Sequence, residues 1–288
     1  MEGRFILIGG TGFFGSALAG ALRARGATVL TASRRESSGG GQHIRVCLPG
    51  DIRGVEDALR PGDRIVYLVA ATPLRRPLGG RRTYRRLHLE GFRTVLALAE
   101  TRGVQQLTYT SALGVHTAAG SAYAETKARA ETLLADSRVR GTVVAPSILF
   151  GRGSELVSAL DLVSRLPVVP IPSLSAPFRP IHVADAARIT ASALTSTQPP
   201  PRVELSGPEL LTVTEIARSY LEPRGTTVIE LPRALSRRAV SLVSRIKLPG
   251  APAELEGMLA IDNAGAPPED PTALIRFTEW ASRYHSDR

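Results

Sequence analysis

A glycine-rich turn near the N-terminus most constrains how this chain can fold. The segment GGTGFFG, residues 9–15, follows a short apolar run at residues 5–8 and precedes an apolar pattern of helical period at residues 16–25. A buried strand that enters a helix through a glycine turn is typical of a strand–helix–strand unit in a parallel sheet. The first residues of the chain therefore favour a layered α/β fold.

The glycines of this turn are spaced to admit a dinucleotide. Gly9 permits a tight turn, Gly12 lets the backbone approach a pyrophosphate, and Gly15 lets the helix pack closely on the strand. The first amides of the helix have no partner within it, and the helix dipole favours a phosphate there. The residues predicted to bind the phosphates are Gly9, Thr11, Gly12, Phe13, Phe14 and Gly15.

Strand and helix patterns alternate along the next part of the chain. The predicted strands span residues 28–32, 64–70, 106–110 and 141–145, and the predicted helices span residues 55–59, 87–102 and 122–136. This alternation predicts a doubly wound parallel sheet of the Rossmann type, with helices on both faces.

The pattern changes after Gly151. Residues 166–180 hold five prolines and are predicted to form a surface loop, and residues 208–288 are predicted to be helical pieces separated by prolines. Between them, residues 181–194 resume a strand-to-helix pattern, and residues 203–205 form a last strand. We expect a dinucleotide-binding core in residues 1–150, a smaller, partly interleaved substrate region in residues 151–180 and 207–288, and a return of residues 181–206 to the core.

The end of the second predicted strand bears on which dinucleotide binds. An acidic residue there would hold the ribose 2′-hydroxyl of NAD, but the chain has Ser33, Arg34 and Arg35. A pair of guanidinium groups suits a 2′-phosphate by charge and geometry, so the sequence favours NADP(H), with NAD(H) left open. Asp51 and Ile52 are predicted to lie where the third strand ends, in reach of the adenine. The alternative for Asp51 is a solvated turn.

A tyrosine and a lysine four residues apart, Tyr123 and Lys127, share one face of a predicted helix. Only two of the 36 basic residues are lysine, so a lysine at this position is informative. A tyrosine with a pKa of about 10 is a poor acid–base group at neutral pH, and a nearby ammonium stabilises its phenolate. Ser111, at the end of the strand predicted at residues 106–110, is placed to donate to a substrate oxygen. These three side chains predict proton transfer at a carbonyl or hydroxyl group.

Together these motifs carry a family resemblance. The segments GGTGFFG, TSALGV, YAETK, APSILFGRG and PIHVADAA resemble the short-chain dehydrogenase/reductase superfamily, in its extended or atypical, epimerase-like branch. The pattern is most similar to the Rossmann-type accessory subunit of respiratory complex I and its bacterial relatives. The resemblance implies that Ser111, Tyr123 and Lys127 are catalytic and that Tyr123 and Lys127 also bind the cofactor.

The resemblance implies further contacts and shows departures. Segments matching those that line the cofactor and its nicotinamide amide contain Ala70, Ala71, Thr72, Pro146, Ser147 and Ile148. His88 stands where members often carry asparagine, so its role in a proton relay is in doubt, and a hydrogen-bonded helix histidine is the alternative. Ala145 stands where an arginine often precedes the proline. Residues 110–112 lack the adjacent acids of sugar dehydratases, which argues against dehydration.

The implied reaction is hydride transfer between a nicotinamide and a carbonyl or carbinol carbon, by a ketoreductase or a nucleotide-sugar epimerase. A non-catalytic NADP(H)-binding structural or assembly subunit is the alternative from another class, although the serine, tyrosine and lysine favour an enzyme. The expected substrate is a small molecule with a carbonyl or hydroxyl group. The basic segment at residues 75–86 would suit an anionic substrate, or it is a solvated loop.

Composition limits the other classes of protein. The formal net charge is +10, but the basic residues are nearly all arginine and the aromatic residues are not interleaved with them, so we do not expect nucleic-acid binding. A single cysteine, Cys47, and five scattered histidines predict no metal site.

Membrane attachment and export are not expected either. No apolar run is long enough to span a membrane, and residues 233–248 are predicted to form a pocket wall rather than a membrane-bound helix. Glycines interrupt the uncharged residues 5–22, which disfavours a secretory signal. We expect a cytoplasmic protein, for which a homodimer is an open alternative.

Overall fold

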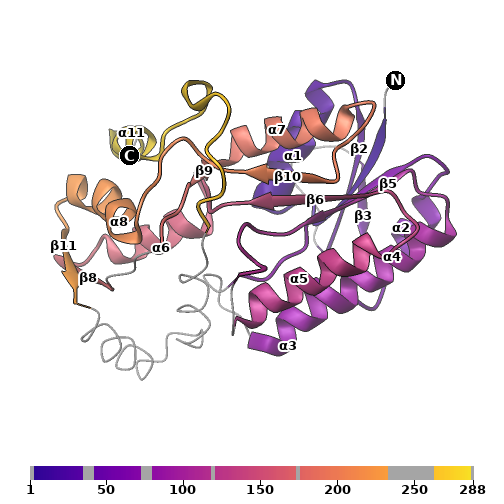
Figure 1. Cartoon of the computed structure of the whole chain (residues 1–288), viewed down its shortest axis with the longest axis horizontal. Helices are drawn as coiled ribbons and strands as arrows, with labels where there is room; N and C mark the ends of the chain where they lie inside the picture. Colours follow the sequence, from indigo (N-terminus) through magenta and orange to yellow (C-terminus); the bar gives the residue numbers. More distant parts are fainter. Residues whose placement is uncertain are drawn as a thin grey trace.

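A parallel sheet forms the centre of the computed structural model, which describes residues 3–34, 42–72, 80–117, 121–172, 176–232 and 263–286 (Figure 1). Its seven strands follow the order β10-β6-β5-β4-β1-β2-β3, and each neighbouring pair is parallel. This order confirms the predicted doubly wound fold. The strands are β1 (Arg4–Ile8), β2 (Thr28–Ser33), β3 (His43–Arg45), β4 (Arg64–Tyr67), β5 (Gln106–Thr110), β6 (Gly141–Pro146) and β10 (Arg202–Leu205).

Helices cover both faces of the sheet, as Figure 1 shows. Alternate residues of β1 separate the two layers: Phe5 and Leu7 pack in the cluster of α1 and α7, whereas Ile6 and Ile8 pack in the cluster of α4. Burial on both faces explains why residues 5–8 of β1 are a continuous apolar run in the sequence. One layer holds α1 (Phe13–Ala24) and α7 (Val183–Thr195), and the other holds α2 (Arg53–Ala58), α3 (Gly80–Tyr84), the π-helix η1 (Arg85–Glu90), α4 (Gly91–Thr101) and α5 (Ala122–Ala135).

The C-terminal region packs around a separate apolar cluster beside the sheet, which includes Phe150, Tyr220 and Phe277. A short parallel pair, β7 and β9, links it to the sheet. Its elements are β7 (Leu149–Phe150), α6 (Glu155–Val163), β8 (Val168–Pro172), β9 (Ile181–His182), α8 (Val213–Leu221), η2 (Glu222–Arg224), β11 (Thr227–Leu231), η3 (Pro271–Ala273) and α11 (Phe277–Ser286).

Two predictions about the C-terminal region are wrong. Residues 166–180 are not a loop throughout, because β8 lies within them, and residues 208–288 are not only helical, because β11 pairs with β8 in parallel. Pro170 and Pro172 lie within β8 although proline lacks an N–H. A strand with one neighbour needs donors on one side only, so this position tolerates proline.

Several element boundaries also differ from the predictions. The strand predicted at residues 64–70 ends at Tyr67, and the first helix begins at Phe13, because its first turn is the end of the glycine turn. Helical structure precedes residue 87, so the basic segment is a helix from Gly80 onward rather than a loop. Residues 75–79 and 233–248 lie outside the described residues. In the described part of the chain, no helix combines the length and the apolarity that crossing a membrane requires.

Candidate active site

The predicted cofactor residues follow the carboxyl ends of neighbouring strands. Gly9 follows β1, Arg34 follows β2, Ala70 to Thr72 follow β4, and Ser111 follows β5. Pro146 is the last residue of β6, and Ile148 comes shortly after it. Ligands of doubly wound sheets bind at this edge, beside the strand where the order reverses, which here is β1. Arg35 is not among the residues that the structure describes.

The glycine turn is too crowded for side chains at several of its positions, among them Gly9 and Gly15. Gly9 has a φ of +90°, and a Cβ on it would lie 3.1 Å from the backbone of Leu68 and Val69. A Cβ on Gly15 would lie 2.4 Å from the Gly9 carbonyl oxygen. Glycine at these two positions therefore lets β1, the start of α1 and the segment after β4 pack together.

The start of α1 suits a pyrophosphate. Gly12 is its N-cap and has no side chain to cap the helix, and the first turn contains no acidic residue. The first amides of α1 are therefore left for a ligand, and the helix dipole favours an anion there. Phe14 is buried in the core, so only its backbone is suited to this role. These features fit a bound dinucleotide.

Basic side chains lie at the end where the adenosine ribose is expected. Ser33, the last residue of β2, pairs in register with Arg45 of β3, and Arg34 is exposed directly after it. The sequence analysis did not identify Arg45, because the three-residue β3 has no apolar pattern that would reveal the register. Arg34 and Arg45 place positive charge on two neighbouring strands at this corner.

The prediction that Asp51 lies at the end of the third strand is wrong. That strand, β3, ends at Arg45, and Asp51 lies in the turn before α2, where Ile52 is the N-cap. Its carboxylate accepts from the Arg53 guanidinium at 3.1 Å. Hydrogen bonds from Arg53 lower the pKa of Asp51, so the carboxylate is ionised and already has a partner.

Lys127 connects α5 to the end of β5. Ser121 caps α5 by accepting from the Ala124 N–H, and Lys127 lies one turn after Tyr123. The Lys127 Nζ donates to the Thr110 carbonyl at 2.6 Å and lies 5.8 Å from the centre of the Tyr123 ring. Ser111 follows Thr110, and its buried hydroxyl has no hydrogen-bond partner in the described structure. A donor of this kind is suited to an incoming oxygen.

Burial moves the pKa values of Lys127 and Tyr123 in opposite directions, because it disfavours the charged form of both side chains. It lowers the pKa of Lys127 to about 7, and the negative charge of Glu131 opposes that change. Burial raises the pKa of Tyr123, and Glu155 and Tyr84 raise it further. The phenol is therefore protonated at neutral pH, while the lysine titrates in that range.

His88 joins the segment after β4 to α5. Its Nε2 accepts from the Ala71 N–H at 3.1 Å, so the neutral ring carries its proton on Nδ1, 3.0 Å from the Thr126 hydroxyl. Burial, and then the charge of Lys127, lower its pKa well below the usual value, so the ring is neutral. Its centre lies 5.4 Å from that of the Tyr123 ring. Both ring nitrogens are bonded, as in the hydrogen-bonded helix histidine weighed above.

Glu155 is a residue of this site that the sequence analysis missed. It is the first residue of α6, and its carboxylate accepts from the Thr72 hydroxyl. It also acts electrostatically on Tyr123. The C-terminal region therefore reaches the cofactor segment through Glu155, a contact between residues too far apart in the sequence to leave a local signal.

Comparisons with known proteins agree with this arrangement. The model of the NAD-dependent epimerase/dehydratase family matches residues 5–204. No curated protein matches the chain. The predicted likeness to the accessory subunit of complex I stays a prediction.

Solved structures share the fold at low sequence identity. An NADPH-dependent quinone oxidoreductase from Escherichia coli, in complex with NADPH, is 17% identical with a TM-score of 0.75, over 98% of this chain and 99% of that chain. A nucleoside-diphosphate-sugar epimerase from Staphylococcus aureus is 16% identical with a TM-score of 0.74, over 98% of this chain and 100% of that chain. A Thermus thermophilus UDP-glucose 4-epimerase in complex with NAD is 19% identical with a TM-score of 0.67, over 91% of this chain and 100% of that chain.

The family model covers well over half of the chain, and the sheet order and the glycine turn agree with it. The chain therefore belongs to the NAD-dependent epimerase/dehydratase family, which places it among the nicotinamide-dependent oxidoreductases and epimerases that the sequence predicts.

Proposed function

We propose that this protein is an NADP(H)-dependent reductase of a small carbonyl compound, in which Tyr123 donates the proton. The observation that carries the proposal is the buried pair of Tyr123 and Lys127 beside the unpartnered Ser111 hydroxyl. A protein that only stores or displays a nucleotide has no need for a buried ammonium next to a phenol.

Each of the three side chains has one task in the reaction. The bound nicotinamide supplies a hydride to the carbonyl carbon. Tyr123 gives its hydroxyl proton to the carbonyl oxygen, and Ser111 donates a hydrogen bond to the same oxygen. Lys127 stabilises the phenolate that remains on Tyr123. The products are the alcohol and the oxidised cofactor, and the phenolate regains its proton from solvent.

The electrostatics of the site keep Tyr123 in its protonated form. Burial, Glu155 and Tyr84 all raise the pKa of Tyr123, so the group enters the reaction as an acid. Reduction needs an acid at this position, whereas oxidation of an alcohol needs a base. Near neutral pH the free protein therefore holds Tyr123 in the protonation state that reduction requires.

The charge at the adenosine end supports NADP(H) as the cofactor. Arg34 and Arg45 lie on neighbouring strands, and β2 ends in Ser33 rather than in an acid. A guanidinium forms two parallel hydrogen bonds with a phosphate, which an NAD ribose lacks. Arg35, the other arginine of the sequence motif, would add to the same charge.

A nucleotide-sugar epimerase is the second candidate, because the chain belongs to the NAD-dependent epimerase/dehydratase family and a nucleoside-diphosphate-sugar epimerase shares its fold. An epimerase uses the same three side chains to oxidise a sugar hydroxyl and then reduce the ketone, so no cofactor is consumed. The C-terminal region would then hold the nucleotide.

The cytoplasmic location and the homodimer stay predictions.

One assay separates the candidates. Purified protein is incubated with NADPH and a panel of aldehydes, ketones and quinones, and separately with nucleotide sugars and catalytic cofactor. NADPH oxidation that is lost in Tyr123→Phe supports the reductase. Interconversion of a nucleotide sugar without net NADPH oxidation supports the epimerase. Cofactor binding without either reaction would refute both and favour the structural subunit.

A further inference from the structure

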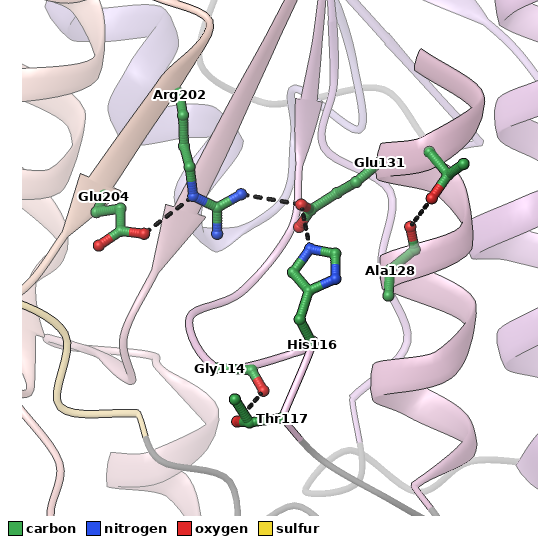
Figure 2. A network of polar contacts seen from close by, with 8 residues as sticks. Gly114, His116, Thr117, Ala128, Glu131, Arg202 and Glu204 are labelled. Carbon is green, nitrogen blue, oxygen red and sulfur yellow. Dashed lines mark hydrogen bonds and ion pairs between the residues drawn. The ribbon is translucent and has the colours of Figure 1, made fainter. Parts of the chain in front are cut away.

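A buried carboxylate lies one helical turn beyond Lys127. Glu131 of α5 is 7% exposed, and its Oε2 accepts from Arg202 Nη1 at 2.9 Å and from His116 Nε2 at 2.8 Å (Figure 2). On the far side, Arg202 Nε donates to Glu204 at 2.9 Å. The contacts therefore form one continuous polar network, in which Glu131 is the buried residue.

This polar network joins three elements that frame the site. Glu131 belongs to α5, Arg202 is the first residue of β10 at the edge of the sheet, and His116 lies in the segment that begins with Ser111. Arg202 and Glu131 are 71 residues apart in the sequence, so their contact exists only in the folded protein. The position of α5 relative to Ser111 therefore depends on a shared carboxylate.

Glu131 also shares a face of α5 with the reactive residues. Tyr123, Lys127 and Glu131 are spaced by four, which places them in line, with neighbouring Cβ atoms about 5–6 Å apart. Both direct bonds go to Oε2, while the buried Oε1 has no hydrogen-bond partner in the described structure. A carboxylate in this setting is a counter-charge for the buried ammonium one turn away.

We propose that Glu131 is a positioning residue for the reaction, which keeps Lys127 charged in its buried position and anchors α5 against the Ser111 segment and β10. The inference rests on the proposed function for its catalytic meaning, because a charged Lys127 matters through Tyr123. Burial lowers the pKa of Lys127 and so favours its neutral form, whereas the negative charge of Glu131 raises that pKa and favours the ammonium.

The scarcity of lysine allows a direct test. The chain contains two lysines, Lys127 and Lys247, so protein labelled with 13C at the lysine side chains gives two signals, and Lys247→Arg assigns them. The titration of Lys127 is followed by NMR in the wild type, in Glu131→Gln and in Glu204→Gln. Glu204→Gln is the matched control, because it makes the same chemical change in the same network without touching Glu131.

We expect the wild-type Lys127 to titrate at about 7 and Glu131→Gln to lower that midpoint by about one pH unit, at the low end of the effect of a nearby opposite charge. Glu204→Gln should leave the midpoint where it is. An unchanged midpoint in Glu131→Gln, or an equal drop in both variants, would overturn the proposal.

Folding and function are checked separately. Circular dichroism establishes that each variant is folded. If Glu131→Gln is not, Glu131→Asp withdraws the charge by one methylene and must lower the midpoint in the same direction, or the proposal fails. The NMR readout needs no substrate. A lowered midpoint in a protein that reduces no carbonyl compound would leave the effect of Glu131 on the charge of Lys127 intact and refute the proposed function alone.

Discussion

Replacing Tyr123 by phenylalanine tests the proposed proton donor with little disturbance of the structure. The Tyr123 ring packs edge-to-face against His88 at 5.4 Å and against Tyr84 at 5.8 Å, and phenylalanine keeps both contacts. The bond from Lys127 to the Thr110 carbonyl does not involve the phenol and should remain. The variant therefore loses one hydroxyl and the proton that it carries.

The expected loss of rate follows from that hydroxyl. A positioned general acid contributes about 10²- to 10⁴-fold, so we expect kcat to fall by at least about 100-fold, which is about 3 kcal/mol in the barrier. NADPH affinity and the free energy of unfolding should change by less than about 1 kcal/mol, because no charged contact is removed. The assay is NADPH oxidation with the best substrate of the carbonyl panel, together with NADPH titration by fluorescence and urea unfolding.

Tyr220→Phe is the matched control, because it removes a hydroxyl from a tyrosine outside the site. The Tyr220 hydroxyl donates to the Asp161 carboxylate at 2.6 Å within the C-terminal cluster. Its loss should destabilise the protein by about 1.5–3 kcal/mol and leave kcat unchanged. If Tyr123→Phe keeps kcat within about threefold of the wild type, as Tyr220→Phe should, the assignment of Tyr123 as the acid is refuted.

Three further predictions concern the cofactor and the buried lysine. NADPH should bind more tightly than NADH, and the double variant Arg34→Ala, Arg35→Ala should lose about 10- to 100-fold in NADPH affinity by fluorescence titration; equal affinities that the variant leaves unchanged would refute the assignment. Gly15→Ala should destabilise the protein by about 1–3 kcal/mol in urea unfolding and weaken NADPH binding, because its Cβ would lie 2.4 Å from a carbonyl oxygen. Gly20→Ala, on the same helix with nothing within 4 Å, should instead stabilise it by about 0.8–1 kcal/mol, and equal effects would refute the packing argument. Burial lowers the pKa of Lys127 from 10.5 to about 7, so the unfolded state binds the extra proton between these values and the free energy of unfolding should rise with pH across this window. Lys127→Met should flatten that rise, and a slope equal to the wild type would contradict the assigned pKa.

Sequence patterns within a few residues predicted most of the fold. The glycine turn and the apolar run of β1 are each readable within a few residues, because a strand buried on both faces is largely apolar. The end of the third strand was predicted at Asp51 instead of Arg45, because the three residues of the edge strand β3, from His43 to Arg45, are only partly buried or exposed. The strands β8 and β11 were missed because they pair across more than 50 residues and β8 contains prolines.

In the candidate site, too, the residues recognisable from a local pattern were predicted and those that depend on long-range contacts were not. Tyr123 and Lys127 were found because their spacing of four is a property of one helix. Glu131 and Glu155 were not, because their partners, such as Arg202 and Thr72, are brought to them only by the folded sheet. Sequence patterns within one element predicted the reactive groups, whereas the residues that hold those groups required the tertiary structure.

The return of the chain to the sheet after the C-terminal region begins decides which fragments of this protein can be made. Residues of α7 and β10, among them Ala187, Leu194 and Leu205, complete the apolar cluster that covers Phe5 and Leu7. A fragment ending near residue 150 would expose that face of α1 and leave β6 as an unpaired edge, an aggregation hazard. The smallest fragment that keeps this layer whole therefore extends to about residue 206, and it carries part of the C-terminal region with it. Exchange of C-terminal regions between relatives would accordingly need two junctions in the chain rather than one.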